Sequence, residues 1–369
     1  MRIQSVRLHH FRNYTDETIA FPDAIVLFYG KNGQGKTNIL ESLYMGSIGK
    51  SYRGLSDTEL IQWEQDEGSI MLDFVRHDVP QQIKIILSKA KKKELWINET
   101  KVPQRELMGT LHEVLFSPED LQLIKGSPAL RRRFMDMEIS QVSPTYYRDL
   151  LQYNRALAQR NLLLKKMRYE GPISLTEWDT QLAKLSASIV SKRLASLHKM
   201  SFLAGVIHKR LSAGQERLTM AYVQPYVQDG THTLADMVRP AWYYDLLQER
   251  KEDDMYRAAT SIGPHRDDLS FQIDGVDVKK YGSQGQQRTA VLALKLSELE
   301  YMKSESGEYP VLLLDDVMSE LDEQRRQALL QFVRGRIQTF ITTTEPVIFT
   351  DMKDCYPICI EQGKAQCHG

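Results

Sequence analysis

A glycine-rich segment that follows an apolar run constrains this chain more than any other feature. Residues 30–37 read GKNGQGKT and fit the pattern GxxxxGK[ST]. Residues 24–29 before it are apolar and predict a strand buried on both faces, and residues 38–43 predict a helix. In this order, backbone N–H groups of the loop and the helix N-terminus can both face a phosphate. The sequence therefore predicts an α/β protein that binds a nucleoside triphosphate.

The residue types in this loop suit separate roles. The glycines let the backbone approach phosphate oxygens, the Lys36 side chain can reach the β- and γ-phosphates, and the Thr37 hydroxyl can bind Mg²⁺. We expect ATP and Mg²⁺ as the cofactors. The predicted nucleotide-binding residues are Gly30, Lys31, Asn32, Gly33, Gln34, Gly35, Lys36 and Thr37.

Two carboxylates end a second apolar run. Residues 311–314 read VLLL and are followed by Asp315 and Asp316, a pattern that predicts a buried strand with acids at its carboxyl end. Asp315 would bind Mg²⁺, and Asp316 would orient or deprotonate an attacking water, because adjacent strand residues point to opposite sides. A solvated turn is the alternative for the isolated segment. The phosphate loop in the same chain favours the functional interpretation.

The long stretch between these motifs predicts an insertion. Nearly 280 residues separate Lys36 from Asp315, whereas one βαβ step needs only about 30. Residues 146–169 and 175–211 have helical spacing of apolar residues. The chain as a whole is neutral, yet residues 131–210 hold 15 Lys or Arg and 6 Asp or Glu. Such an excess fits either a solvated helical face or a nucleic-acid contact.

A second glycine turn precedes another predicted helix. Residues 281–288 read YGSQGQQR and lead into apolar helical spacing over residues 289–301. Ser283 and Gly285 would lie at the start of this helix, where a hydroxyl and free N–H groups can meet an anion. An ordinary helix cap explains the same residues about equally well.

Taken in order, these motifs resemble the ABC-type ATPases, and within their DNA-repair and SMC-like branch they resemble the RecF family. The segments are FRNY at 11–14, FSPEDL at 116–121, GSP at 126–128, RRRF at 131–134, GPHRDDL at 263–269 and SELD at 319–322. The resemblance covers essentially the whole chain. It implies an ABC-type ATPase head of mixed sheet and helices, formed by residues 1–125 and 256–369, with a helical arm inserted at 126–255.

The resemblance also implies a mechanism and partners. Ser283 and Gly285 would act on ATP held by the phosphate loop of a second copy, and Asp322 would lie near the seam of this ATP-dependent homodimer. Lys36, Asp316 and Ser283 would be the catalytic residues of a slow ATPase. The arm would bind DNA through Arg131, Arg132 and Arg133, mostly at phosphates. The family implies recombinational repair and replication-gap processing, with recombinase loading together with RecO and RecR, and SOS induction.

Some residues depart from the wider superfamily and keep other classes open. Gln284 stands where transporter-type signatures have Gly, Asp316 replaces the usual Glu, and residues 341–345 lack a His. A nucleotide-binding subunit of a membrane transporter and a P-loop kinase of small molecules are the alternatives. Arg12 and Asn13 are further candidates for nucleotide contact, with a strand-end turn as the other interpretation.

The remaining features bear on location and metal binding. The longest apolar run, residues 24–29, is far shorter than the roughly 20 residues of a membrane span. We expect a cytoplasmic protein without a membrane partner. Cys355, Cys359 and Cys367 lack paired zinc-site spacing, although His368 follows the last of them, and we expect free thiols.

Overall fold

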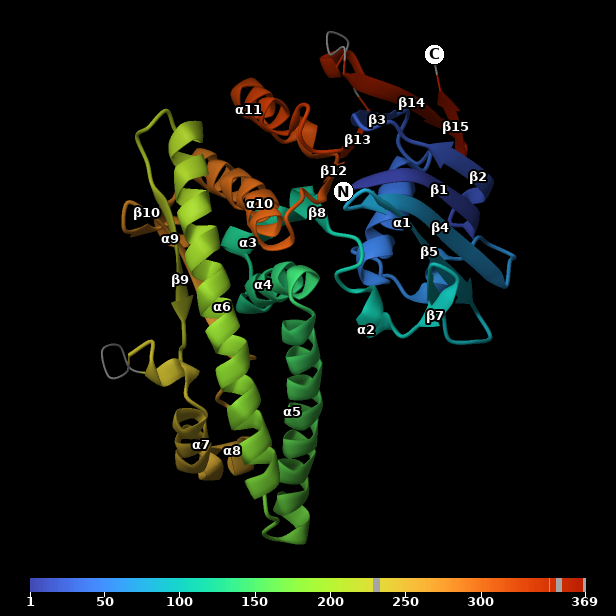
Figure 1. Cartoon of the computed structure of the whole chain (residues 1–369). Helices are drawn as coiled ribbons and strands as arrows, with labels where there is room; N and C mark the ends of the chain where they lie inside the picture. Colours follow the sequence, from blue (N-terminus) through green and yellow to red (C-terminus); the bar gives the residue numbers. More distant parts are fainter. Residues whose placement is uncertain (228–232, 345, 350–353, 368–369) are drawn as a thin grey trace. The chain divides into compact units, whose positions relative to one another are not determined.

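The computed structural model describes residues 1–227, 233–344, 346–349 and 354–367 (Figure 1). The chain forms two compact units, of which the first joins Met1–Leu121 to Val291–Gly369 and the second is Gln122–Ala290. The second boundary differs from the predicted 255/256. Strand β10 (Asp268–Ile273) pairs antiparallel with β9 (Leu218–Val223), so the main-chain hydrogen bonds of a sheet extend the second unit past residue 255.

A mostly parallel sheet positions the phosphate loop in the first unit. Its order is β15-β14-β3-β13-β12-β8, and only β15 runs antiparallel to its neighbour. The strands are β3 (Ile25–Tyr29), β8 (Glu113–Phe116), β12 (Val311–Asp315), β13 (Thr339–Thr343), β14 (Cys355–Glu361) and β15 (Lys364–Cys367). Strands β3 and β12, far apart in the sequence, are separated by β13 alone. Their carboxyl ends therefore meet at one edge, where parallel sheets bind ligands.

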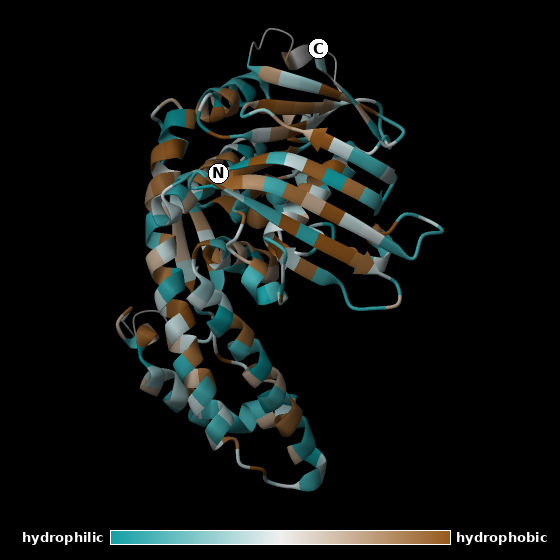
Figure 2. Cartoon of the chain, turned by 45° about the vertical axis from the view of Figure 1, so that its right-hand side comes forward, coloured by the Kyte–Doolittle hydropathy of each residue, from teal (hydrophilic) through white to brown (hydrophobic). Residues whose placement is uncertain are grey.

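An antiparallel sheet completes the first unit, in the order β2-β1-β4-β5-β6-β7. Its strands are β1 (Arg2–Phe11), β2 (Tyr14–Ala20), β4 (Glu67–Arg76), β5 (Val79–Ser88), β6 (Glu94–Ile97) and β7 (Thr100–Val102). Apolar and hydrophilic residues alternate along its longer strands (Figure 2). One apolar core joins both sheets to helix α1 (Lys36–Ile48), and it includes Leu8, Leu43 and Phe340.

The second unit is built around two long helices, as the sequence predicted. Helix α5 (Pro144–Glu170) and helix α6 (Thr176–Leu211) lie side by side (Figure 1). Ser143 caps α5, its hydroxyl accepting from the Tyr146 N–H at 3.3 Å. The unit also holds α3 (Gln122–Lys125), α4 (Pro128–Val142), η3 (Asp236–Val238), α7 (Pro240–Glu249), α8 (Lys251–Arg257), β9, β10, β11 (Val276–Asp277) and α9 (Val278–Tyr281).

Some of the arginines counted in the arm lie inside the second unit and pair with carboxylates there. Arg160, which is fully buried, donates to Asp179 and Asp254, each at 2.6 Å. Arg193 is also buried, and its guanidinium donates to Asp136 at 2.7 Å. These two arginines hold the helices together and are not exposed cations, but ten of the 15 Lys and Arg in residues 131–210 are exposed, so the arm keeps a basic surface.

The elements that complete the fold lie mainly in the first unit. They are η1 (Asp57–Leu60), α2 (Gln104–Leu107), η2 (Pro118–Leu121), η4 (Val317–Ser319), α11 (Glu323–Val333) and η5 (Pro346–Phe349), together with α10 (Gln284–Ser306), which begins in the second unit. Helix α10 starts five residues before the predicted helix at 289. Among the described residues, no helix combines the length and apolar character that crossing a membrane requires.

Candidate functional site

The phosphate loop has the backbone geometry that its glycines predict. Gly30, Gly33 and Gly35 have φ of 146°, 78° and 117°, which side-chain-bearing residues rarely adopt. A Cβ atom on Gly30 would lie 2.4 Å from the Ile360 carbonyl oxygen, and one on Gly35 would lie 2.6 Å from Asn13 Nδ2. Glycine is therefore required at 30 and 35 by close packing as well as by conformation.

Two segments distant in sequence hold the loop in place. Asn13 Nδ2 donates to the Gln34 carbonyl at 2.8 Å, and Asn13 Oδ1 accepts from Asn38 Nδ2 at 2.8 Å. In the turn between β14 and β15, the Gly363 N–H also donates to the Gln34 carbonyl, at 3.2 Å. Both ends of the Asn13 amide thus support the loop. Arg12 likewise binds protein groups, Glu41 at 3.2 Å and the Glu59 carbonyl at 3.1 Å.

The support that Asn13 and Gly363 give to the phosphate loop yields a prediction for Gly363, a residue far from any motif. In a Gly363→Ala variant, the added Cβ would lie 2.2 Å from the Asn13 carbonyl oxygen. The turn or Asn13 must then shift away from Gln34, and we expect ATP affinity to fall by about tenfold, since such strain is on the order of 1–3 kcal/mol. Equilibrium binding of a fluorescent ATP analogue measures this change.

The matched control is Gly335→Ala. Gly335 also has positive φ, 64°, but a Cβ there would meet no atom within 4 Å. Both variants carry similar backbone strain, and only the first disturbs the loop. Equal ATP affinity in the two variants would contradict the role of Asn13 and Gly363 in supporting the phosphate loop.

Lys36 lies over the loop in a position suited to phosphate. Its ammonium donates to the carbonyl oxygens of Gly30 at 2.6 Å and Lys31 at 2.9 Å. Burial lowers the pKa of Lys36, while the nearby carboxylates of Asp316 and Asp315 oppose that shift. The ammonium is therefore placed where the negative charge of a phosphate would compensate for its desolvation.

The carboxylate of Asp315 collects three hydroxyl donors. Its Oδ1 accepts from Thr37 Oγ1 at 3.0 Å and from Thr342 Oγ1 at 2.8 Å. Its Oδ2 accepts from the Tyr52 hydroxyl at 2.6 Å. The helix that follows the loop and the strand β12 thus bring Thr37 and Asp315 into direct contact, although 278 positions separate them.

This donor set fits Mg²⁺ that is shared with a nucleotide. Mg²⁺ in phosphate-binding sites takes one or two carboxylates, a hydroxyl, waters and phosphate oxygens. Thr37 and Asp315 supply the protein share of such a set. Among the described residues, no group of three or more His, Cys, Asp and Glu could hold a metal without a phosphate.

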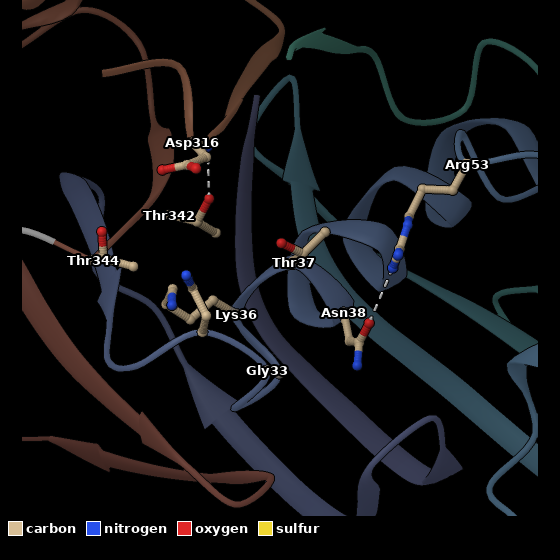
Figure 3. A pocket seen from close by; sticks show the side chains of 10 residues that line it. Gly33, Lys36, Thr37, Asn38, Arg53, Asp316, Thr342 and Thr344 are labelled. Atoms are coloured by element: carbon tan, nitrogen blue, oxygen red, sulfur yellow. Dashed lines mark hydrogen bonds between the residues drawn. The ribbon is translucent and has the colours of Figure 1, made fainter. Parts of the chain in front are cut away.

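Asp316 belongs to the wall of the nucleotide cavity. It has φ 54°, and its N–H donates to Thr342 Oγ1 at 2.9 Å. The left-handed turn directs its side chain into the cavity (Figure 3). The cavity measures about 260 Å³ and is lined by Asn32, Gly33, Gly35, Lys36, Thr37, Asn38, Arg53, Asp316, Thr342 and Thr344.

Five of the residues in and around this cavity were not predicted as site residues, and one of them, Asn38, directly follows the phosphate loop. Arg53 lines the cavity from the segment after α1, and no recognisable motif marks it. Thr342 lies near the end of β13, and Thr344 directly follows that strand. Tyr52 does not line the cavity, but its hydroxyl donates to Asp315. The threonines could have been found, because polar residues after a buried parallel strand face the same edge as the phosphate loop.

Ser283 and Gly285, which are predicted to act on the ATP of a second copy, lie in the second unit. The Ser283 hydroxyl, which is exposed, accepts from the Gln286 N–H at 3.2 Å, and Gln286 Oε1 accepts from the Ser283 N–H at 2.8 Å. This reciprocal cap fixes the start of α10, with Gly285 in its first turn. In the first unit, Asp322 caps α11 by accepting from the Arg325 N–H at 2.9 Å, and it also pairs with the Arg325 guanidinium. The roles of Ser283, Gly285 and Asp322 toward ATP stay predictions.

The structure corrects the predicted DNA contacts on α4. Arg131 is 4% exposed, and its guanidinium pairs with Asp268 through two hydrogen bonds of 2.7 and 2.9 Å. Arg132 is half-buried and donates to the Asp267 carbonyl at 2.7 Å. Only Arg133 of the three is exposed. Successive helical residues point about 100° apart, so three consecutive arginines cannot all face solvent, and Arg131 packs inside the unit.

His265, Cys355 and Cys359 are not among the described residues that line the nucleotide cavity. Burial lowers the pKa of His265 to about 4, and its Nδ1 lies 2.6 Å from the Tyr153 hydroxyl oxygen. Cys355 and Cys359 form no disulfide, whereas the side chain of Cys367 and the whole of His368 lie outside the described residues.

Comparison with protein families and sequences gives a consistent result. Residues 2–366 match the family model described as the RecF/RecN/SMC N terminal domain. A DNA replication and repair protein RecF of Halothermothrix orenii is 44% identical over 351 residues, which cover 94% of this chain and 92% of that protein. The protein of the same description from Enterococcus faecalis is 41% identical over 376 residues, covering 99% of each.

Solved structures extend the likeness to three dimensions. A structure of the recombination mediator protein RecF-ATP in the RecFOR pathway superposes with a TM-score of 0.91 at 34% identity, covering 100% of this chain and 97% of that one. An Smc head domain derived from Pyrococcus furiosus gives a TM-score of 0.58 at 15% identity, covering 99% of this chain and 95% of that one. The second likeness shows the fold alone. The predicted ABC-type ATPase fold is confirmed.

Proposed function

Because the chain belongs to the RecF family of the RecF/RecN/SMC ATPases, we propose that it is an ATP-dependent DNA-binding protein of recombinational repair and replication-gap processing. The observation that supports this function best is the single cavity wall shared by the phosphate loop, Thr37 and Asp316, with Asp315 bonded to Thr37. The near-complete coverage of RecF relatives favours it over a transporter subunit or a small-molecule kinase.

The side chains of the cavity divide the work of slow ATP hydrolysis. Loop N–H groups and Lys36 hold the phosphates, and Thr37 and Asp315 hold Mg²⁺, which when bound neutralises phosphate charge. Asp316, in the left-handed turn directly after β12, orients or deprotonates the attacking water. Arg53 reaches the same cavity and adds a positive charge toward the phosphates.

The ATP would join two copies of the chain. The exposed start of α10 presents Ser283, Gly285 and the helix N-terminus, an arrangement that suits the γ-phosphate of ATP bound to a second copy. Asp322 would lie near the seam. In this proposal ATP closes a homodimeric clamp on DNA, hydrolysis opens it, and the clamp helps to load recombinase with RecO and RecR and supports SOS induction.

DNA binding by the second unit should show a strong salt dependence. Contacts to phosphates release counterions, so the logarithm of affinity should fall steeply with the logarithm of salt concentration. We expect Arg133→Ala to reduce the magnitude of this slope by about 1, as loss of one phosphate contact does. Fluorescence anisotropy of labelled duplex DNA with ATP present, repeated over a salt series, measures the slope.

Two comparisons make this test specific. Arg105→Ala, an exposed arginine of the first unit, should leave the slope unchanged. Arg131→Ala should instead lower the melting temperature of the protein, because it leaves Asp268 without its guanidinium partner. A salt-independent affinity in the unaltered protein would refute DNA binding through phosphates.

A further inference from the structure

The segment directly after α1 is tied to the nucleotide site by three consecutive side chains. The Ser51 hydroxyl donates to Glu41, and the Tyr52 hydroxyl donates to Asp315 Oδ2 at 2.6 Å. Arg53 Nη1 lies 3.5 Å from Asn38 Oδ1 and lines the cavity (Figure 3). A loop without any sequence motif therefore touches both the predicted Mg²⁺ ligand and the cavity.

Tyr52 is held so that its hydroxyl can act only as a donor toward the carboxylate. Its ring packs edge-on against Tyr44, with 5.4 Å between ring centroids. A tyrosine hydroxyl, whose ordinary pKa is about 10, is protonated at neutral pH, and this one donates a hydrogen bond to the Asp315 carboxylate.

The donors divide the two oxygens of Asp315 between separate tasks. Oδ1 accepts from Thr37 and Thr342, and Thr37 is the other predicted Mg²⁺ ligand. Oδ2 accepts from Tyr52. A carboxylate held at only one oxygen can rotate about its terminal torsion, whose energy profile is broad. The bond from Tyr52 removes this freedom and keeps Oδ1 directed toward Thr37.

From this geometry we infer that Tyr52 is a positioning residue for the Mg²⁺–nucleotide complex. It does not line the nucleotide cavity, and it acts by fixing the orientation of Asp315. Second-neighbour partners of this kind typically change metal affinity by about 10- to 100-fold when removed. The inference rests on the ATP site of the proposed function.

Tyr52→Phe tests the inference, because it keeps the ring packed on Tyr44 and removes only the hydroxyl. The binding of a fluorescent ATP analogue is measured first in EDTA and then across a Mg²⁺ titration. We expect affinity in EDTA to stay within about twofold of the unaltered protein, and the Mg²⁺ concentration for half-maximal tightening to rise by about tenfold. This readout does not depend on ATP hydrolysis.

Tyr309→Phe is the matched control. The Tyr309 hydroxyl also donates to a carboxylate of the first unit, Glu300 Oε1, at 2.9 Å, and neither residue lines the cavity. It should leave the Mg²⁺ requirement unchanged. A general loss of stability from a missing tyrosine–carboxylate bond would move the melting temperatures of both variants, but would not raise the Mg²⁺ requirement of one alone.

A double variant separates positioning from other effects. In an Asp315→Asn background, Tyr52→Phe should cause no further change in the Mg²⁺ requirement. An unchanged requirement in Tyr52→Phe alone overturns the inference. If that variant does not fold, Tyr52→Leu, which also lacks the hydroxyl, decides instead, and an unchanged requirement there overturns the inference equally. Unaltered protein that binds no ATP with Mg²⁺ would refute the proposed function itself.

Discussion

Replacing Asp316 by asparagine should lower the rate of ATP hydrolysis by about 100-fold or more, the usual contribution of a positioned general base. The Asp316 side chain points into the nucleotide cavity, and its backbone is fixed by the bond from its N–H to Thr342. An amide of nearly the same shape keeps this geometry but cannot take a proton from water. The binding of ATP should stay within about twofold, because Lys36 and the loop hold the phosphates.

Phosphate release under saturating ATP and equilibrium binding of a fluorescent ATP analogue together measure this effect. Asp16→Asn provides the control, since Asp16 is an exposed carboxylate paired with Arg7 on the antiparallel sheet. Asp315→Asn should behave differently and weaken Mg²⁺-dependent binding as well as hydrolysis. If Asp316→Asn hydrolyses ATP at the normal rate, the base lies elsewhere, and the assignment of roles to the two acids fails.

Local patterns in the sequence predicted those parts of the fold that depend on neighbouring residues. The apolar runs before Gly30 and Asp315 form β3 and β12, and the helical spacing around Gly171 forms α5 and α6. The insertion was predicted because Lys36 and Asp315 lie too far apart for adjacent strands. Pairing over long distances was not predictable, and the β9–β10 ladder therefore placed residues 256–290 in the second unit.

In the candidate site, too, some residues could be predicted from local sequence patterns and others could not. Glycine spacing and paired acids identify the loop, Asp315 and Asp316, because phosphate binding restricts those residue types. Tyr52 and Arg53 have no such restriction, and only the folded chain brings them to the cavity and to Asp315. Arg131 shows the converse error, in which a charged run was assigned to the surface although one member pairs with Asp268 inside the unit.

Ser283→Arg should abolish ATP-dependent dimerisation while leaving ATP binding by the monomer intact. Ser283 is exposed at the start of α10 and belongs to a different compact unit from the phosphate loop. In the proposed dimer the arginine side chain, much larger than serine, would prevent the close approach of α10 to the ATP of the partner copy, and overpacking of this kind costs on the order of 1–3 kcal/mol or more. We expect dimer affinity to fall by about 100-fold or more. Light scattering after size exclusion, with ATP under non-hydrolysing conditions, measures it.

Mixing two defective variants tests whether each nucleotide site is shared between copies. Lys36→Met lacks phosphate binding but keeps its Ser283 surface, whereas Ser283→Arg lacks that surface but keeps its phosphate loop. Neither should dimerise alone, and an equal mixture should recover about half of the composite sites, one intact site in each mixed dimer. Ser174→Arg, at an exposed position before α6, should dimerise normally. If Ser283→Arg also forms ATP-dependent dimers by itself, Ser283 does not complete the site of a second copy.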